Sequence, residues 1–139
     1  MTEISYLKIL VPIAGPIPAR DNVERIMRLA KRLRAEVIAL NIVKRLDEVA
    51  KCEQGKEALR IFEDAAIKHS VKISTFLKEG ELIQTLVDYA NEQDPDLIVM
   101  GASEDGRMIA EWIVSDLRYK TDLPVVIEPH GFGKITGEI

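Results

Sequence analysis

Short apolar runs alternate along the chain with longer segments whose apolar residues recur at helical spacing. The runs at residues 7–13 (LKILVPI) and 37–43 (VIALNIV) are nearly continuous, which predicts buried strands of a parallel sheet. Residues 97–100 (LIVM) and 125–127 (VVI) predict two further short strands. Residues 71–77 (VKISTFL) alternate between apolar and polar positions, which indicates an edge or half-exposed strand.

Two helical segments follow the first two strands. Residues 21–34 carry apolar side chains three or four positions apart, and Asp21 and Glu24 have the spacing of a capping box at the helix start. Residues 44–55 are charged and lack periodicity, so we expect a loop or a frayed helix start there. One face of the second helix is then formed by Leu59, Phe62, Ala65, Ala66 and His69.

Two more helices complete the pattern. Gly80 opens the third, and the Asp94-Pro95 step ends it because the residue before a proline disfavours the helical conformation. The core face of the fourth is formed by Met108, Ile109, Trp112, Ile113 and Leu117. This alternation of strands and helices predicts an α/β fold with right-handed crossovers and a parallel sheet covered on both faces.

Size and composition fit one domain. The chain has 139 residues, of which 47% are hydrophobic and 30% charged, and this excludes a disordered or low-complexity chain. We expect a core over about residues 7–129 and a loosely held tail at residues 130–139.

The net charge and the single cysteine exclude some classes of function and indicate the cellular compartment. With 19 basic and 23 acidic residues the net charge is −4, so the chain lacks the field of a general nucleic-acid or membrane-surface binder. Cys52 has no partner for an internal disulfide and the N-terminus lacks a signal-peptide pattern, which together predict a cytoplasmic protein. The longest uncharged run, residues 9–19, is too short to span a membrane.

The first helical segment is rich in basic residues, and these predict a solvated helix face because no aromatic residues are interleaved with them. They are Arg20, Arg25, Arg28, Lys31, Arg32 and Arg34. Two separated histidines, His69 and His130, and one cysteine lack metal-ligand spacing, so we expect no metal site. No Ser-His-Asp set and no GxxxxGK[ST] loop is present, so we assign no catalytic residue and favour a non-enzymatic role.

Three segments, in this order and spacing, resemble the universal stress protein family: ILVPI at residues 9–13, DPDLIVMGAS at residues 94–103 and LPVVIEP at residues 123–129. The resemblance covers about residues 7–129. It implies a three-layer, doubly wound sandwich that is Rossmann-like and adenine nucleotide alpha hydrolase-like, with a five-stranded parallel sheet in the order 3-2-1-4-5. It also implies a homodimer, often formed through the last strand, and a division into an ATP-binding branch and a non-binding branch.

Several positions that the ATP-binding branch uses are altered here. That branch has an aspartate just after the first strand, where this chain has Ala14. The first glycine of its phosphate loop corresponds to Gly101, but the second and third glycine positions hold Glu104 and Val114. The hydroxyl that follows is kept as Ser115. Because glycines let backbone N–H groups approach phosphate oxygens, the resemblance implies the branch with a degenerate loop.

Ligands of open parallel sheets bind beyond the carboxyl ends of the strands. The candidate pocket there consists of Pro12, Ile13, Ala14, Ile42, Gly101, Ser103 and Ser115. The last strand would lie at the sheet edge with unpaired backbone groups, which a second copy would satisfy. The expected dimer interface is Val125, Val126 and Ile127.

The predicted function is that of a universal stress protein-like cytoplasmic stress-response or signalling module, which acts as a homodimer, has protein partners and binds no ATP or other cofactor. The alternative is a protein that binds AMP, ATP or another small ligand in an altered pocket, because the small Ala14 leaves space there. An ATPase is the least favoured hypothesis, since a fold alone does not imply activity.

Overall fold

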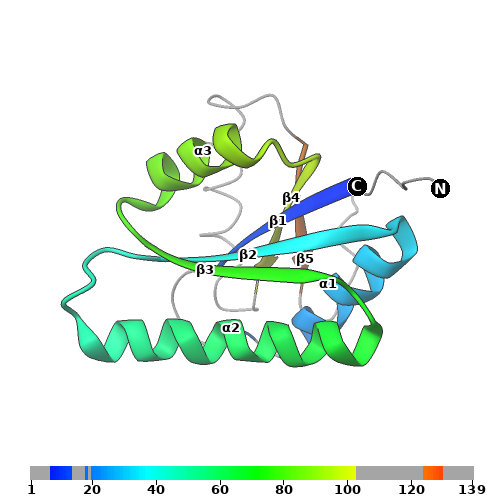
Figure 1. Ribbon diagram of the computed structural model, residues 1–139, viewed down its shortest axis with the longest axis horizontal. Helices are drawn as coiled ribbons and strands as arrows, with labels where there is room; N and C mark the ends of the chain where they lie inside the picture. The colour runs from blue at the N-terminus through cyan, green and yellow to red at the C-terminus, as the bar shows by residue number, and fades with distance from the viewer. Residues whose placement is uncertain (1–6, 14–17, 19, 103–123, 130–139) are drawn as a thin grey trace.

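The computed structural model describes residues 7–13, 18, 20–102 and 124–129 of the chain. Its strands are all parallel and form one sheet in the order β3-β2-β1-β4-β5 (Figure 1). They are β1 (Leu7–Ile13), β2 (Ala35–Val43), β3 (Ile73–Glu79), β4 (Leu97–Ala102) and β5 (Val125–Pro129). The expected α/β, Rossmann-like class with a parallel sheet is therefore confirmed.

The helices cover both faces of the sheet. They are α1 (Arg20–Leu33), α2 (Val49–His69) and α3 (Leu82–Gln93). In Figure 1, α1 and α2 lie on one side of the strands and α3 lies on the other. The expected fourth helix and the tail at residues 130–139 lie outside the described residues.

The sheet separates two apolar clusters, because successive side chains of a strand point to opposite faces. Ile9, Val11 and Ile13 of β1 belong to the cluster under α1 and α2. Leu10 lies between them in sequence and belongs to the cluster under α3. Both faces of the central strands are thus buried, which is why their sequences are nearly continuous apolar runs.

Strand β3 has the half-exposed character that its alternating sequence predicted. Its side chains switch between partly buried and exposed positions, and Phe76 is 41% exposed. The strand covers Ile73–Glu79 rather than residues 71–77, so the prediction began two residues early. The cause is the end of α2, where Ser70 turns the chain with φ 58° and Val71 N–H still donates to the Ala66 carbonyl.

The structure decides between the two alternatives predicted for residues 44–55. The helix begins at Val49 and includes Gly55, so residues 49–55 are the start of the helix rather than a loop. Cys52 lies on the buried side of this first part, and its Sγ is 3.4 Å from the Leu46 carbonyl oxygen. The apolar pattern was hidden because the buried positions there are filled by a cysteine and a glycine.

The predicted capping box at the start of α1 is wrong. The helix begins at Arg20, which places Asp21 inside its first turn. The Glu24 carboxylate contacts α2, with Oε1 2.7 Å from His69 Nε2. Glu24 therefore joins two helices, whereas a capping box would have joined it to its own backbone.

Candidate functional site

The carboxyl ends of β1, β2 and β4 lie at one edge of the sheet, where the sequence predicted a pocket. Ile13 pairs with Asn41 at the ends of β1 and β2. Ile9 pairs with Leu97 in β4, and the same offset continued along both strands sets Gly101 level with Ile13. The strand order reverses at β1, which has β2 on one side and β4 on the other. This point is the topological switch at which ligands of such folds bind.

The described candidates at this edge are apolar and buried. Pro12 and Ile13 end β1, and Ile42 is the second-last residue of β2. Ile13 belongs to the cluster under α1 and α2, whereas Ile42 belongs to the cluster under α3. The two isoleucines therefore lie on opposite faces of the sheet and cannot line one side of a pocket together.

The remaining candidates are only partly within the described residues. Gly101 is the fifth residue of β4, and its backbone pairs with Glu128 of β5. Ala14, Ser103 and Ser115 lie outside the described residues. The part of the chain that the structure describes thus brings the ends of β1, β2 and β4 together, while the loop contacts of the predicted pocket stay a prediction.

Asn41 is a buried polar residue at this edge that the sequence analysis did not single out. Its side chain lies against the backbone of α2 at Gly55, and only 3% of the residue is exposed. The signal was present in the sequence, because Asn41 is the one polar residue in the run VIALNIV. Its contact with α2 indicates a packing role under the helix.

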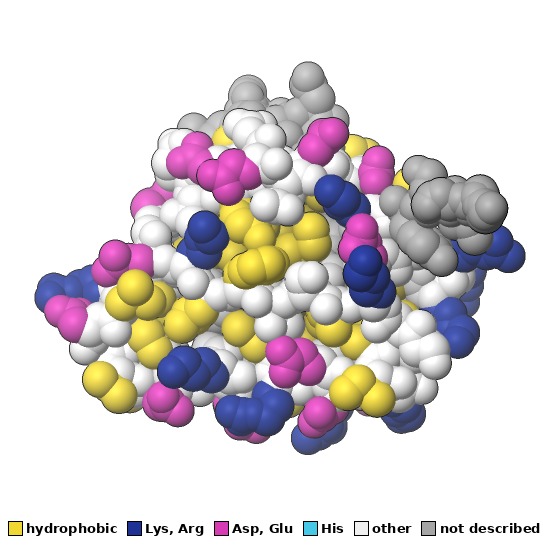
Figure 2. Space-filling view, viewed as in Figure 1, with side chains coloured by type: hydrophobic (Ala, Val, Ile, Leu, Met, Phe, Trp, Pro, Cys, Tyr) yellow, Lys and Arg dark blue, Asp and Glu magenta, His cyan; other side chains and the backbone are white. Residues whose placement is uncertain are grey.

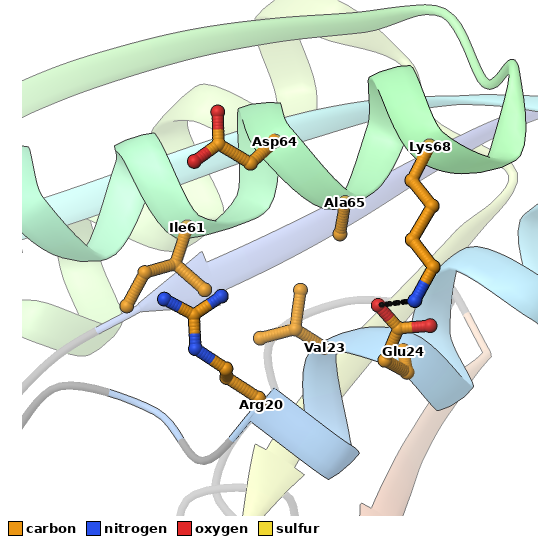
Figure 3. Close-up of a pocket in the computed structure, with 7 residues that line it drawn as sticks. All are labelled: Arg20, Val23, Glu24, Ile61, Asp64, Ala65 and Lys68. Atoms are coloured by element: carbon orange, nitrogen blue, oxygen red, sulfur yellow. Dashed lines mark hydrogen bonds and ion pairs between the residues drawn. The ribbon is translucent and has the colours of Figure 1, made fainter.

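A hollow of about 310 Å³ lies between α1 and α2 (Figure 3). Val23 of α1 and Ile61 and Ala65 of α2 supply its apolar lining. Its charged lining residues are Arg20 and Glu24 of α1 and Asp64 and Lys68 of α2, of which Glu24 and Lys68 point toward each other. The sequence analysis did not foresee this site, because its residues come from two helices that are about forty positions apart in the chain.

No group of three or more His, Cys, Asp and Glu side chains suited to a metal ion occurs among the described residues. None of the described helices combines the length and the apolar character needed to cross a membrane.

Comparison with known proteins identifies the family of this chain. The model of the universal stress protein family matches residues 5–115. The chain belongs to the universal stress protein family. The match includes every candidate pocket residue from Pro12 to Ser115, whereas Val125, Val126 and Ile127 lie beyond it.

Individual universal stress proteins agree with this assignment. A universal stress protein of Methanocaldococcus jannaschii is 30% identical over 115 residues, which cover 73% of this chain and 67% of that protein. A universal stress protein of Helicobacter pylori is 36% identical over 77 residues, which cover 54% of this chain and 55% of that protein. The structure of the universal stress protein UspA from Lactobacillus plantarum has a TM-score of 0.72 and 24% identity, and the match covers 91% of this chain and 99% of that one.

In this universal stress protein, α1 and α2 are joined by a cluster of charges around Glu24. Its carboxylate lies 2.7 Å from His69 Nε2, 3.4 Å from Lys68 Nζ and 3.9 Å from Arg28 Nη1. The hydrogen bond with His69 holds the pKa of Glu24 below its usual value, and Lys68 lowers it further. Lys31 adds a second link between the helices, since its Nζ donates to the His69 carbonyl over 3.1 Å.

This lowered pKa predicts an acid-sensitive contribution to stability. Because folding lowers the pKa of Glu24, the contact stabilises the protein above the usual glutamate pKa of 4.5 and is lost as the pH falls through the folded-state value. We expect Glu24→Gln to reduce the free energy of unfolding by up to about 1 kcal/mol at pH 7, since the groups are partly exposed. Urea unfolding between pH 7 and pH 3 measures how far this difference shrinks.

Glu57→Gln is the matched control, because among the described residues Glu57 pairs within α2, with Arg60 at 3.0 Å. It should cost less than Glu24→Gln at pH 7. A Glu24→Gln difference that stays constant down to pH 3 would contradict the role of this carboxylate between the helices.

Proposed function

We propose that this universal stress protein is a stress-response or signalling module that acts as a homodimer in the cytoplasm and does not bind ATP. The observation that carries the proposal is the replacement of two expected phosphate-loop glycines by Glu104 and Val114. Membership of the family supports the stress-response role, and the convergence of β1, β2 and β4 supports a site at this edge.

The proposed loss of ATP binding follows from charge and backbone chemistry. Glu104 and Asp105 stand in the loop segment, Asp116 follows Ser115, and Arg107 is the one cation between Gly101 and Ser115. A like-charge contact at about 4 Å costs roughly 1–4 kcal/mol under partial screening. Two such contacts lower the affinity for a triphosphate by about a thousandfold.

Calorimetric titration of the nucleotide-stripped protein with Mg-ATP tests this proposal. We expect no saturable heat up to millimolar nucleotide. The double variant Glu104→Gly/Asp116→Ala, which removes two acidic side chains, should bind Mg-ATP more tightly than the unmodified chain does. Micromolar binding by the unmodified chain would show that the charge argument is wrong.

A second candidate function is binding of a nucleoside monophosphate. Solved structures with this fold include universal stress proteins in complex with cAMP, with dAMP from Archaeoglobus fulgidus, and with AMP from Arabidopsis thaliana. A monophosphate brings less negative charge toward Glu104 than a triphosphate does. Titration with AMP separates the two functions, since the module proposed first gives no heat with either nucleotide.

The proposed dimer rests on the position of β5. Among the described strands β5 is the last in the sheet, beside β4, and we expect its other side to pair with a second copy. We expect light scattering at micromolar concentration to give twice the mass of one chain. Ile98 of β4 donates to the Pro124 carbonyl, so the parallel pattern directs the Val126 N–H to β4 and the Ile127 N–H away from it. Ile127→Pro therefore removes a donor from the outer side of the strand and should give monomers. A monomeric unmodified protein, or a folded Ile127→Pro variant that stays dimeric, would contradict this interface.

A further inference from the structure

Strand β3 has a row of backbone groups that point away from the sheet. Among the described strands its one neighbour is β2. The Lys72 carbonyl accepts from the Val37 N–H of β2, so the even-numbered residues of this segment bond to β2. Gly80 shows the same at the other end, since its N–H donates to the Val43 carbonyl of β2. The residues whose N–H and C=O groups point outward are therefore Ile73, Thr75, Leu77 and Glu79.

This edge lacks the features that usually keep a strand edge from pairing with another chain. Natural edge strands are protected by prolines, bulges or charged side chains. Residues 73–77 (ISTFL) contain no proline and no charge, and their pairing with β2 is continuous. Charged side chains follow only at Lys78 and Glu79, where the strand ends. The backbone of most of β3 is therefore suited to pairing with another extended chain.

The middle residue of β3, Phe76, adds an apolar contact surface to this edge. Its side chain lies on the face that α3 covers, with its ring centroid 5.8 Å from that of Tyr89, and yet the residue is 41% exposed. Lys78 Nζ lies 5.2 Å from the centroid of the same Tyr89 ring. Figure 2 shows hydrophobic side chains gathered at the centre of this face of the molecule, between β3 and α3. Phe76 is thus held by α3 and still offers apolar surface to a partner.

Antiparallel pairing with β3 of a second copy would use both the backbone groups and Phe76. A twofold axis across the edge gives each copy the same contacts. Full overlap of Ile73–Glu79 with itself sets Phe76 directly opposite Phe76 of the second copy, because Phe76 is the middle residue. Thr75 then exchanges backbone hydrogen bonds with Leu77 of the second copy. The two Phe76 rings therefore occupy the non-hydrogen-bonded position, where side chains of an antiparallel pair are closest.

The charges of the strand agree with this register. Lys78 of one copy faces Ser74 of the other, and Glu79 faces Ile73, so no like charges stand directly opposite each other. A shift by two residues in one direction would set Lys78 against Lys72 of the second copy, which is a destabilising pair. A shift in the other direction leaves the start of the strand unpaired. Full overlap is therefore the favoured register.

We propose that β3 pairs in antiparallel orientation with β3 of a second copy, with the two Phe76 side chains in contact across the twofold axis. The contact is small, since Phe76 is the one large hydrophobic residue of β3 that is exposed. We therefore expect it to form at a higher concentration than the proposed β5 dimer does. It lies at the opposite end of the strand order from β5, so it would join β5 dimers into larger assemblies.

Two substitutions by glutamate test the register with opposite signs. Phe76→Glu sets two carboxylates opposite each other and should weaken the pairing, whereas Ser74→Glu sets a carboxylate opposite Lys78 and should strengthen it. Each change should be about threefold to tenfold in the Kd of self-association at low salt. Both variants add the same charge, so a general effect of net charge would move both in one direction. Sedimentation equilibrium up to millimolar protein measures them in the Ile127→Pro background, where the β5 edge is blocked.

A disulfide cross-link tests the same register with β5 intact. Phe76→Cys, in a Cys52→Ala background that removes the natural thiol, places two thiols opposite each other across the pair. Oxidised glutathione should then give a covalent dimer on a non-reducing gel. Ser74→Cys is the matched control, because position 74 is on the same exposed face but lies opposite position 78 rather than itself. Circular dichroism confirms that every variant is folded.

Support requires that the mass of the Ile127→Pro variant rises with concentration, that the two glutamate substitutions change the Kd in opposite directions, and that Phe76→Cys cross-links faster than Ser74→Cys. A mass that stays at one chain up to millimolar protein overturns the proposal. The same direction of change for both glutamates, or equal cross-linking at positions 74 and 76, also overturns it. If Ile127→Pro does not fold, the cross-linking variants decide alone, since they do not depend on how β5 pairs.

Discussion

Replacing Leu86 with alanine should lower the free energy of unfolding by about 2–5 kcal/mol, the range for truncation of a fully buried leucine. Leu86 is 0% exposed and lies on α3, where it packs in the apolar cluster between this helix and the sheet. The truncation removes apolar contacts and leaves a cavity that the rigid sheet backbone cannot fill. Urea unfolding followed by circular dichroism measures the loss.

Leu46→Ala is the matched control, because it makes the same chemical change at a leucine that is 52% exposed. It should change the free energy of unfolding by much less than Leu86→Ala. Equal effects of the two substitutions would contradict the packing of α3 against the sheet.

Gly55→Ala should destabilise the protein although alanine is the better helix former. A Cβ at position 55 would overlap Asn41 Oδ1, and would lie 2.8 Å from Asn41 Cγ and 3.2 Å from Leu77 Cδ1. Alanine gains about 1 kcal/mol of helix propensity over glycine, whereas overpacking of a core costs about 1–3 kcal/mol. We expect a net loss of up to about 2 kcal/mol, which thermal or urea unfolding will measure.

The second half of the Gly55→Ala test removes the Asn41 side chain that the new Cβ would overlap. In an Asn41→Ala background the amide that blocks position 55 is absent, so Gly55→Ala should cost less there and even stabilise the chain. Such a difference is the coupling energy of a double-mutant cycle. The same cost in both backgrounds would mean that the close approach of α2 to Asn41 does not decide the choice of glycine.

The strands could be predicted from the sequence because burial leaves a direct trace in it. A strand with helices on both of its faces has to be apolar at nearly every position, as the run from Ile9 to Ile13 is. In an edge strand one of the two faces is more exposed than the other, which accounts for the alternation in β3. These patterns depend only on a residue's own surroundings, so no knowledge of distant partners is needed.

Helix boundaries were harder to predict because this chain uses unusual residues there. The turns after α1, α2 and α3 hold Arg34, Ser70 and Asp94 at φ 57°, 58° and 51°. Glycine is the ordinary residue for this left-handed conformation and the ordinary sequence signal for a helix end. The third end had another signal, in Pro95. The first helix was predicted to end at residue 34, one residue past Leu33, from its apolar spacing.

The sequence could predict only that part of the candidate site which the ends of the strands form. The alternation of strands and helices was enough to bring Pro12, Ile42 and Gly101 to one edge, because parallel strands end together. Glu24 of α1 and His69 of α2 are 45 positions apart and meet through helix packing. Periodicity could mark each as a helix residue, but it carries no information about which side chain of another helix lies opposite.

The division of the interior by the sheet has a consequence for how the native state fluctuates. The cluster under α1 and α2 and the cluster under α3 share no residue, and each is held to the strands by its own set of side chains. Local unfolding follows such independent units, and amide hydrogen exchange reports their separate free energies of opening. The layer of α3 is therefore free to open while α1, α2 and the strands beneath them stay protected.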